Sequence, residues 1–324
     1  MTREELFKEV RARARGETWR DRRGYELLFI GLRLGLYGLG AALFFIDDLL
    51  VKALAVLVMS YAYFGIVITG THEARHNSLV DSARGNRLLG YLFADALTGQ
   101  SADWWHQRHV KEHHLWTNIR EHDPPLYIFP WMNRYVYFFV VPWVIQLWLL
   151  VNSFQFERAR GGLLRWSSLF VAGYVLQAWP LALELGWPAG LGMCYVVRHT
   201  LSPLFMHLAV FNHIGLEFPE ERGEWVAHQL RTTRNLRWNW FLAGFGGNAF
   251  LNTHIEHHVF PQLSNHELSA ARTVLIEYAE ANGIEYREEG YLEVLRQCLD
   301  GYEALMEQAR ELSEPEISSS QTLA

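Results

Sequence analysis

The chain alternates between long apolar stretches and segments crowded with charged residues. Four apolar stretches come close to the ~20 residues that a helix needs to cross a bilayer. They are Tyr25–Ile46, Leu50–Thr69, Leu163–Leu185 and Ala189–Phe211. Only residues 47–49 separate the first two stretches, and only 186–188 separate the last two. The pattern therefore predicts two tight hairpins of membrane-spanning helices.

The distribution of Lys and Arg indicates whether a fifth apolar stretch, at about 131–152, crosses the membrane. Lys and Arg mark the cytoplasmic side of a membrane protein. They are frequent at the N-terminus, in 72–130 and in 214–324, and they are absent from 186–188. A full crossing by 131–152 would move some of these basic segments to the opposite side. We therefore expect a re-entrant or interfacial helix there, and both termini in the cytoplasm.

These assignments divide the chain into four parts. Residues 1–24 carry eight basic side chains directly before an apolar stretch, which favours a cytoplasmic segment near lipid over one that binds nucleic acid. Residues 25–265 form the predicted membrane domain. Residues 266–312 have the periodicity of charged helices and predict a cytoplasmic cap. Residues 313–324 are rich in Ser and Glu and are expected to be disordered.

Composition agrees with an all-α integral membrane protein. Half of the residues are hydrophobic and 13 are Trp, a residue that concentrates where helices meet lipid headgroups. The chain has only two cysteines, so neither a disulfide framework nor an iron–sulfur site is indicated. Any metal must be held by histidines and carboxylates.

Histidine carries the chemical signal of the sequence. Three clusters read His72-Glu-Ala-Arg-His76, His109-Val-Lys-Glu-His113-His114 and His254-Ile-Glu-His257-His258, and His213 follows the fourth apolar stretch. Spacings of three and four return to one face of a helix. The predicted topology places all nine imidazoles at the cytoplasmic edge of the membrane. By contrast, His122, His228 and His266 stand alone and are expected to be packing or surface residues.

Nine imidazoles exceed the ligands of a single ion and are sufficient for two. Imidazole binds Zn, Cu, Fe and Ni alike, so the ligand type does not name the metal. Iron is favoured because nitrogen-rich sites with open positions are those that react with O₂, whereas hydrolytic zinc needs only three protein ligands and a water.

The first cluster also reads as His-Glu-x-x-His, the helix motif of zinc proteases. Taken alone, it predicts an intramembrane metalloprotease with Glu73 as general base. A distant Asp ligand would then be needed in another span, and the only Leu-Asp-Gly sequence, Leu299–Gly301, lies in the polar tail. This alternative also leaves seven clustered histidines without a role.

The three clusters and their flanks resemble the histidine boxes of membrane fatty acid desaturases and related alkyl hydroxylases. The flanking matches are Trp104-Trp105, Thr117-Asn118, Asn212-His213 and Val259-Phe260-Pro261, and the resemblance covers about residues 60 to 265. It implies that the nine histidines bind two non-heme irons beneath a cytoplasmic cap. These ligands are His72, His76, His109, His113, His114, His213, His254, His257 and His258.

The resemblance also implies the reaction and its partners. The expected function is O₂-dependent oxidation of a fatty acyl chain, most simply desaturation; hydroxylation, or decarboxylation of a free fatty acid to a terminal alkene, would use the same site. The chain lacks the His-Pro-Gly-Gly signature of a fused cytochrome domain, so electrons are expected from a separate ferredoxin or b-type cytochrome. The third box begins with His254 where front-end desaturases typically carry Gln, which argues against that subgroup.

Four further residues are candidates for supporting roles. His106 is an additional histidine beside the second box, and Asn252 precedes the third; both are expected to support the ligands. Arg198 and His199 fall within the fourth apolar stretch, where a charge is costly and usually functional. Arg198 is expected either to pair with a substrate carboxylate or to bind Glu184 or a backbone carbonyl.

Overall fold

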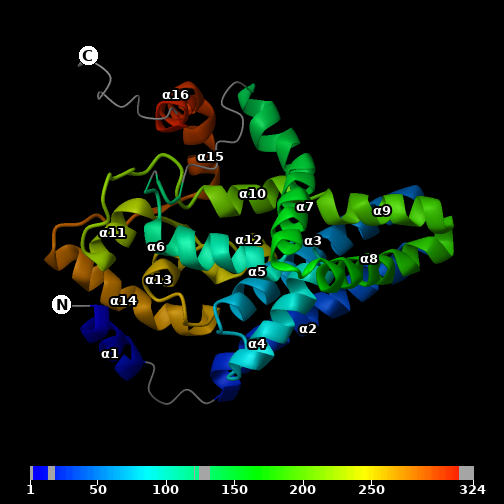
Figure 1. Cartoon of the computed structure of the whole chain (residues 1–324), viewed down its shortest axis with the longest axis horizontal. Coiled ribbons are helices and arrows are strands. Elements are labelled where there is room, and N and C mark those ends of the chain that lie inside the picture. Colours follow the sequence, from blue (N-terminus) through cyan, green and yellow to red (C-terminus); the bar gives the residue numbers. More distant parts are fainter. Residues whose placement is uncertain (1–2, 14–18, 120, 124–131, 314–324) are drawn as a thin grey trace.

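The computed structural model describes residues 3–13, 19–119, 121–123 and 132–313, and this part of the chain is almost entirely helical (Figure 1). The all-α prediction is confirmed. The N-terminal half contains α1 (Arg3–Arg13), α2 (Trp19–Leu43), α3 (Leu49–Arg75), α4 (Ala83–Gly90), the π-helix η1 (Tyr91–Ala96), α5 (Ala102–Trp105), the π-helix η2 (His106–His113), α6 (His114–Trp116), the π-helix η3 (Val136–Val140) and α7 (Val141–Arg160). Residues 314–324, most of the predicted disordered tail, lie outside the described residues.

The second half contains α8 (Leu163–Leu185), α9 (Trp187–His199), α10 (Ser202–Val210), α11 (Trp225–Thr232), α12 (Trp240–Gly246), the 3₁₀ turn η4 (Asn248–Phe250), α13 (His254–Val259), α14 (Asn265–Ala281), α15 (Tyr291–Asp300) and α16 (Tyr302–Ser313). The strands of the described residues, β1 (Asn235–Leu236) and β2 (Glu288–Glu289), pair in parallel and join the segment before α12 to the cap between α14 and α15.

Two long hairpins form the membrane part, as predicted. Helix α2 packs along α3, and α8 packs along α9 (Figure 1). Asp48 begins α3 because its carboxylate accepts the backbone N–H of Val51 at 3.0 Å, which satisfies one of the free donors of the first turn. The outward faces of the hairpins are apolar, as lipid requires: Leu32 is 60% exposed and Leu176 is 68% exposed.

The fourth predicted span is broken. Instead of one helix over Ala189–Phe211, α9 ends at His199 and α10 begins at Ser202. Pro203 gives the reason, because it has no N–H to donate to the carbonyl of His199 four residues earlier and its ring crowds that carbonyl. The apolar composition of the stretch conceals this break.

The fifth apolar stretch forms a long helix. Among the described residues, four segments are long and apolar enough to cross a membrane: Gly24–Leu43, Leu49–Arg75, Val136–Arg160 and Leu163–Leu185. The third of these contains most of the stretch predicted to be interfacial. Figure 1 shows α7 running across the direction of α8 instead of alongside it. This arrangement is consistent with the interfacial position, which stays a prediction.

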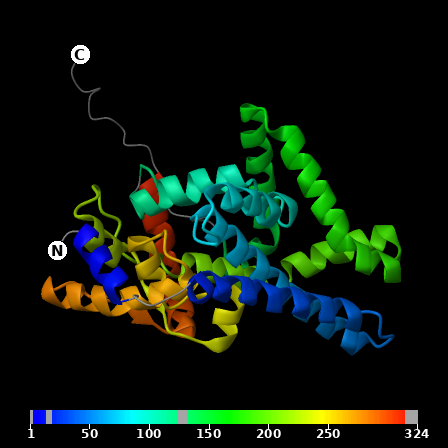
Figure 2. The ribbon, with the colours of Figure 1, turned by 90° about the horizontal axis from the view of Figure 1, so that it is seen from below.

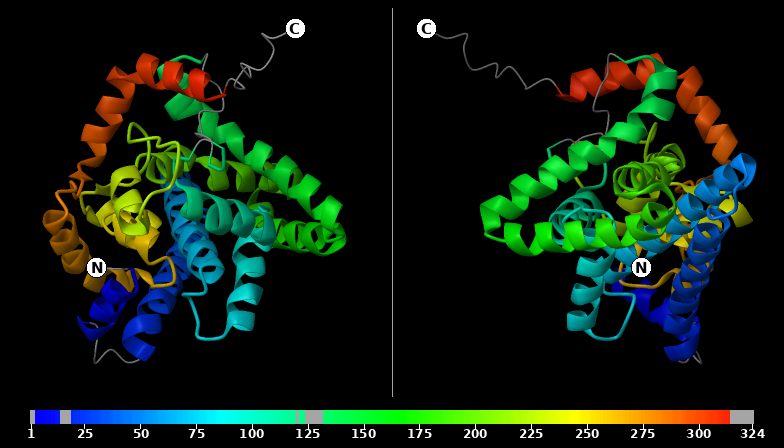
Figure 3. Two further views of the ribbon diagram at one scale, coloured as in Figure 1. Left: turned by 60° about the vertical axis from the view of Figure 1, so that its left-hand side comes forward. Right: turned by 90° about the vertical axis from the view of Figure 1, so that its right-hand side faces the viewer.

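The cap lies at the end of the bundle where α3 finishes. Helix α14 packs on α13 and on α2, and the N-terminal helix α1 lies against α14 with Leu6 and Val10 buried (Figure 2). Arg13 and Glu277 join these two helices through a 2.8 Å ion pair. Helices α15 and α16 lie against η3, which leads into α7 (Figure 3), and Arg134, just before η3, donates to the carbonyl of Leu299 at 2.6 Å. The N-terminal basic segment is therefore partly a packed element of the cap.

Candidate metal centre

The structure brings the nine predicted histidines together from α3, η2, α6, α13 and the turn that follows α10. The first group holds one ligand nitrogen from each of five residues within 4.8 Å of one another: His72, His76, His109, His114 and His257. The second group, within the same limit, contains His113, His213 and His258. The remaining predicted ligand, His254, belongs with the second group, because its Nε2 lies 2.8 Å from Nε2 of His213.

The local winding of the second box divides its histidines between the two groups. Residues His106–His113 form a π-helix, in which the N–H of His114 donates to the carbonyl of His109 five residues earlier. This wide turn places His114 above His109, so both reach the first group. His113 points to the other side and joins the second group. Single π-turns are frequently found at functional sites.

Two pairs of ring nitrogens in the first group have the spacing of ligands on one ion. The Nε2 atoms of His109 and His114 are 3.1 Å apart, and those of His114 and His257 are also 3.1 Å apart. Two imidazole ligands bound at ~2.1 Å and at right angles would be separated by about 3.0 Å. In addition, Nε2 of His72, His76 and His258 is buried and has no hydrogen-bond partner among the described residues. The donor set therefore fits two metal ions.

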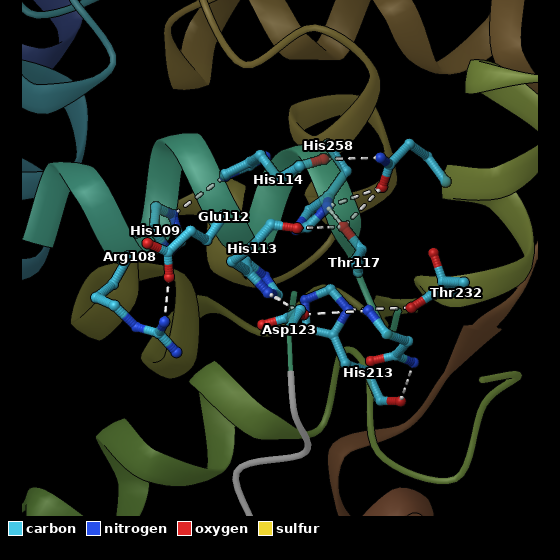
Figure 4. A network of polar contacts seen from close by, with 12 residues as sticks. Arg108, His109, Glu112, His113, His114, Thr117, Asp123, His213, Thr232 and His258 are labelled. Atoms are coloured by element: carbon cyan, nitrogen blue, oxygen red, sulfur yellow. Dashed lines mark hydrogen bonds and ion pairs between the residues drawn. The ribbon is translucent and has the colours of Figure 1, made fainter. Parts of the chain in front are cut away.

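In the second group, the opposite ring nitrogens are held by a second layer of polar groups (Figure 4). Nδ1 of His113 lies 2.8 Å from the carboxylate of Asp123, and Nδ1 of His258 lies 3.0 Å from Oε1 of Gln229. Nδ1 of His213 lies 3.0 Å from the backbone carbonyl of Thr232, and Nδ1 of His254 lies 2.6 Å from the backbone carbonyl of Ala249. Because these acceptors require a proton on Nδ1, they leave the lone pair of Nε2 for the metal.

Burial keeps these imidazoles neutral. It lowers the pKa of His114, His257 and His258 well below the ordinary value of histidine, and neighbouring imidazoles lower the pKa further. Burial likewise lowers the pKa of His213 to about 3, with His113 adding to the shift. A metal ligand must be deprotonated, so the pocket supplies its donors in the binding state at neutral pH.

Glu73 belongs to this supporting layer. Its carboxylate accepts hydrogen bonds from the hydroxyl of Ser78 at 2.6 Å and from the side-chain amide of Asn265 at 3.0 Å. One of its oxygens also lies 3.3 Å from Nδ1 of His72. A general base of a zinc protease has to face the metal-bound water, whereas this carboxylate sits behind His72 and orients it. The arrangement does not favour the protease alternative.

None of the four supporting candidates belongs to either group of ligand nitrogens. His106 lines a surface cavity of about 300 Å³ with Arg75 and Lys111. The backbone carbonyl of Asn252 accepts a hydrogen bond from the guanidinium of Arg272 at 2.7 Å. His199 stacks on Tyr195, with ring centroids 4.0 Å apart.

Arg198 binds a backbone carbonyl, one of the protein partners expected for it in place of a substrate carboxylate. Its guanidinium donates to the backbone carbonyl of Thr98 and, at 3.3 Å, to the hydroxyl of Tyr63. Glu184, the other partner considered for it, instead pairs with Lys52 at 2.7 Å. The geometry therefore explains this intramembrane charge without a substrate carboxylate.

The isolated histidines and the supporting residues show what sequence patterns do and do not reveal. His122 stacks on Trp116, His228 lies 3.0 Å from the carbonyl of Thr117, and neither metal group contains them or His266. The sequence patterns did not predict Asp123 and Gln229 as partners of the ligands. Asp123 follows the second box by only ten residues, so its proximity was a usable signal; Gln229 is far from His258 in sequence and gave none.

Comparison with known proteins is consistent with this geometry. Residues 47–290 match the fatty acid desaturase family. The chain belongs to this family. Fatty acid desaturase 6 from Homo sapiens is 27% identical to this desaturase over 310 residues, which cover 93% of this chain and 86% of that protein. Fatty acid desaturase 6 from Mus musculus is 25% identical over 311 residues, covering 93% and 91%. A Delta(5) fatty acid desaturase from Caenorhabditis elegans is 28% identical over 257 residues, covering 68% and 56%.

Family membership confirms the predicted resemblance and extends to the general function. This desaturase is an integral membrane oxidoreductase that acts on fatty acyl chains. The family match spans the three histidine boxes and His213, and the two groups that could hold metal ions are built from these same segments.

Proposed function

We propose that this protein is an O₂-dependent di-iron desaturase that introduces a C=C bond into a fatty acyl chain. The observation that carries the proposal is the division of nine imidazoles into two adjacent groups, with ring nitrogens 2.8 to 3.1 Å apart within them. One zinc ion for hydrolysis would use only three of these ligands. The names of the relatives support desaturation over hydroxylation and decarboxylation as the outcome.

Iron is the proposed metal because of the donor set and the reaction. Neither group, among the described residues, contains a cysteine or a carboxylate. Two irons held by neutral imidazoles would supply the O₂ chemistry that removes hydrogen from an unactivated CH₂. Nine ligands for two ions also leave open positions, which such chemistry requires.

The protein contributes orientation and exclusion of water. Seven of the nine imidazoles are buried; His258 is fully inaccessible and His114 is 1% exposed. The ring of Trp105 stacks on that of His109, with centroids 4.2 Å apart, and covers the partly exposed side of the first group. Phe250 lies 4.7 Å from the ring of His72 and supplies an apolar wall. A site closed in this way protects a reactive oxidant from bulk water.

The partners and the orientation are part of the proposal. Electrons come from a separate ferredoxin or b-type cytochrome, because the iron has to be reduced before each turnover. The histidine groups and both termini face the cytoplasm, as the distribution of Lys and Arg indicates. The fatty acyl substrate reaches the irons from within the membrane domain.

The test is gas chromatography with mass spectrometry of fatty acids and volatile hydrocarbons from aerated cells that express the chain together with a ferredoxin or cytochrome donor. His257→Ala is the inactive control, since it removes a ligand of the first group. A new unsaturated acid that is absent from the control supports the proposal. A hydroxy acid or a terminal alkene instead identifies the alternative outcome, and no new product with an established donor overturns the proposal.

A further inference from the structure

The segment Trp240–Gly246 is a short helix made only of apolar residues and glycine. Its seven residues cannot cross a bilayer, and charged segments on both sides place the region in the cytoplasm by sequence. Three aromatic side chains at its start are nevertheless exposed: Trp238 by 58%, Trp240 by 71% and Phe241 by 39%. An exposed cluster of this kind outside the long hairpins requires a partner.

Contacts with the membrane-spanning helices locate this segment. The ring of Tyr61, in α3, lies 5.0 Å from that of Phe241, and its hydroxyl donates to the carbonyl of Phe241 at 2.9 Å. Arg33, in α2, donates through Nε to the carbonyl of Gly244 at 2.8 Å. Helix α12 is therefore fixed to the sides of both helices of the first hairpin.

The depth of these contacts follows from helix geometry. Thirteen residues separate Tyr61 from Asp48, at the polar turn of the hairpin. At ~1.5 Å per residue, Tyr61 lies about 20 Å from that turn, whereas the hydrocarbon layer is ~30 Å thick. Arg33 precedes the end of α2 by ten residues, which gives about 15 Å from the same surface. Both contacts lie roughly 10 to 15 Å inside the surface nearest the histidine groups.

We infer that α12 and the turn before it enter the hydrocarbon layer of the leaflet nearest the histidine groups, where Trp238, Trp240 and Phe241 contact lipid. The partner of this surface is the lipid bilayer. The inference requires only that the chain is an integral membrane protein, and it goes beyond the proposed reaction.

The hydrogen bonds of α12 are suited to lipid. A short helix leaves free N–H groups at its start and free carbonyls at its end, and no water is present in hydrocarbon to satisfy them. The side-chain oxygen of Asn239 accepts from the N–H groups of Phe241 at 3.0 Å and Leu242 at 3.2 Å. Arg33 donates to the carbonyl of Gly244 in the last turn, and Tyr61 donates to the carbonyl of Phe241 in the first. The membrane helices therefore supply the partners that water would supply in a soluble loop.

Gly244 allows the close approach. A Cβ at this position would collide with the hydroxyl of Tyr61 and lie 2.6 Å from Nη2 of Arg33. The guanidinium of Arg33 also lies over the rings of Phe29 at 4.6 Å and Tyr61 at 5.3 Å. A charge within a span needs such partners. Arg33, which lacks an acidic partner among these contacts, is explained as the attachment point of α12.

The test uses nitroxide labels in the full chain, reconstituted into phosphatidylcholine nanodiscs. Cys194→Ala and Cys298→Ala remove the two native cysteines, both of which are buried. Trp240→Cys carries the label in question. Leu32→Cys, on the outer face of α2, is the lipid reference, and Leu292→Cys, 73% exposed in the cap, is the water reference. The spin relaxation caused by O₂ is compared with that caused by a water-soluble nickel chelate.

The expected O₂-to-nickel ratio at position 240 resembles that at position 32 and exceeds that at position 292 by several-fold. A ratio at position 240 equal to that at position 292 overturns the inference and indicates a surface for another protein. Trp238→Cys provides a second site if the first variant does not fold, with a ratio above that at position 292 expected. Neither spin-relaxation measurement needs bound iron or turnover, so the result is independent of the proposed reaction.

Discussion

The carboxylate of Asp123 lies 2.8 Å from Nδ1 of His113, and the same oxygen accepts the backbone N–H of Asn118 at 3.1 Å. The aspartate therefore fixes a metal-binding ring and closes the turn that follows the second histidine box. His113 lowers the pKa of Asp123 although burial opposes this shift, so the carboxylate is ionised at neutral pH. A charged acceptor on Nδ1 makes the opposite nitrogen a better electron donor.

Asp123→Asn is expected to weaken metal binding by ~10- to 100-fold, because an amide keeps the shape of the side chain but loses its charge. Iron retained per chain against increasing chelator concentration measures this effect. Asp300→Asn, on the exposed surface of α15, is the matched control and should bind iron as the parent does. Equal retention in both variants would contradict the supporting role of Asp123.

Glu73→Gln separates the oxygenase from the zinc protease. The amide oxygen of the Gln side chain can still accept a hydrogen bond from Ser78 or Asn265. We therefore expect weaker iron binding but measurable desaturation when iron is saturating. A protease would lose all turnover without this carboxylate. Product formation at several iron concentrations distinguishes the two expectations. Complete loss of product at saturating iron in a correctly folded variant would argue against an orienting role for Glu73.

Two glycine substitutions in the second hairpin should have very different effects on thermal stability. A Cβ on Gly173 would overlap the backbone carbonyl of Ala96, which a rigid helix cannot move away, whereas a Cβ on Gly192 has no atom within 4 Å. Gly173→Ala should therefore lower the melting temperature by several degrees. Gly192→Ala should leave it unchanged or raise it slightly, since Ala favours a helix by about 1 kcal/mol over Gly. The two melting curves, measured in one detergent, check both expectations.

Acid should destabilise the metal-free protein. The folded-state pKa of His213 is about 3, and those of His114, His257 and His258 are lowered well below their ordinary value. The unfolded chain begins to bind protons on these groups below pH ~6.5, and the folded chain does not. Each group therefore lowers the free energy of unfolding by about 1.4 kcal/mol per pH unit below that value.

Melting temperatures at pH 7.5, 6.5 and 5.5 measure this loss. The decrease in melting temperature should be small from pH 7.5 to 6.5 and large from pH 6.5 to 5.5, because the stabilising contribution is complete above the unfolded-state pKa. Bound iron should move the loss to lower pH, since the metal competes with protons for the same nitrogens. A melting temperature independent of pH down to 5.5 would show that the histidines are not buried in the neutral form.

Local patterns in the sequence predicted much of this structure. Hydrophobic runs located both hairpin turns and the helices α2, α3 and α8, although the fourth run extended well past the end of α9. Histidine spacing selected all nine residues that meet in the two groups. Pro203 could have indicated the break between α9 and α10, but average hydropathy over the stretch concealed it. Local signals were sufficient here because helices and their faces depend on nearby residues.

Other features depend on contacts between distant segments. Gln229 supports His258 because α11 packs on α13, and no spacing rule connects these residues. Arg198 binds the carbonyl of Thr98, a group that every residue possesses and that no sequence pattern marks. The position of α12 against Tyr61 was missed for the same reason, since a seven-residue apolar run carries no span signal.

The π-turn of the second box determines which of its histidines face the same way. In an ordinary α-helix, at ~100° per residue, His114 would lie roughly 140° around the axis from His109. The extra residue in the turn brings the two rings to the same side. Removal of a single residue between them would leave a spacing of four, which a regular helix also brings to one face, so the pair would survive without the wide turn. Although the segment is helical throughout, its spacing of five residues therefore serves one metal group only in the wide-turn conformation.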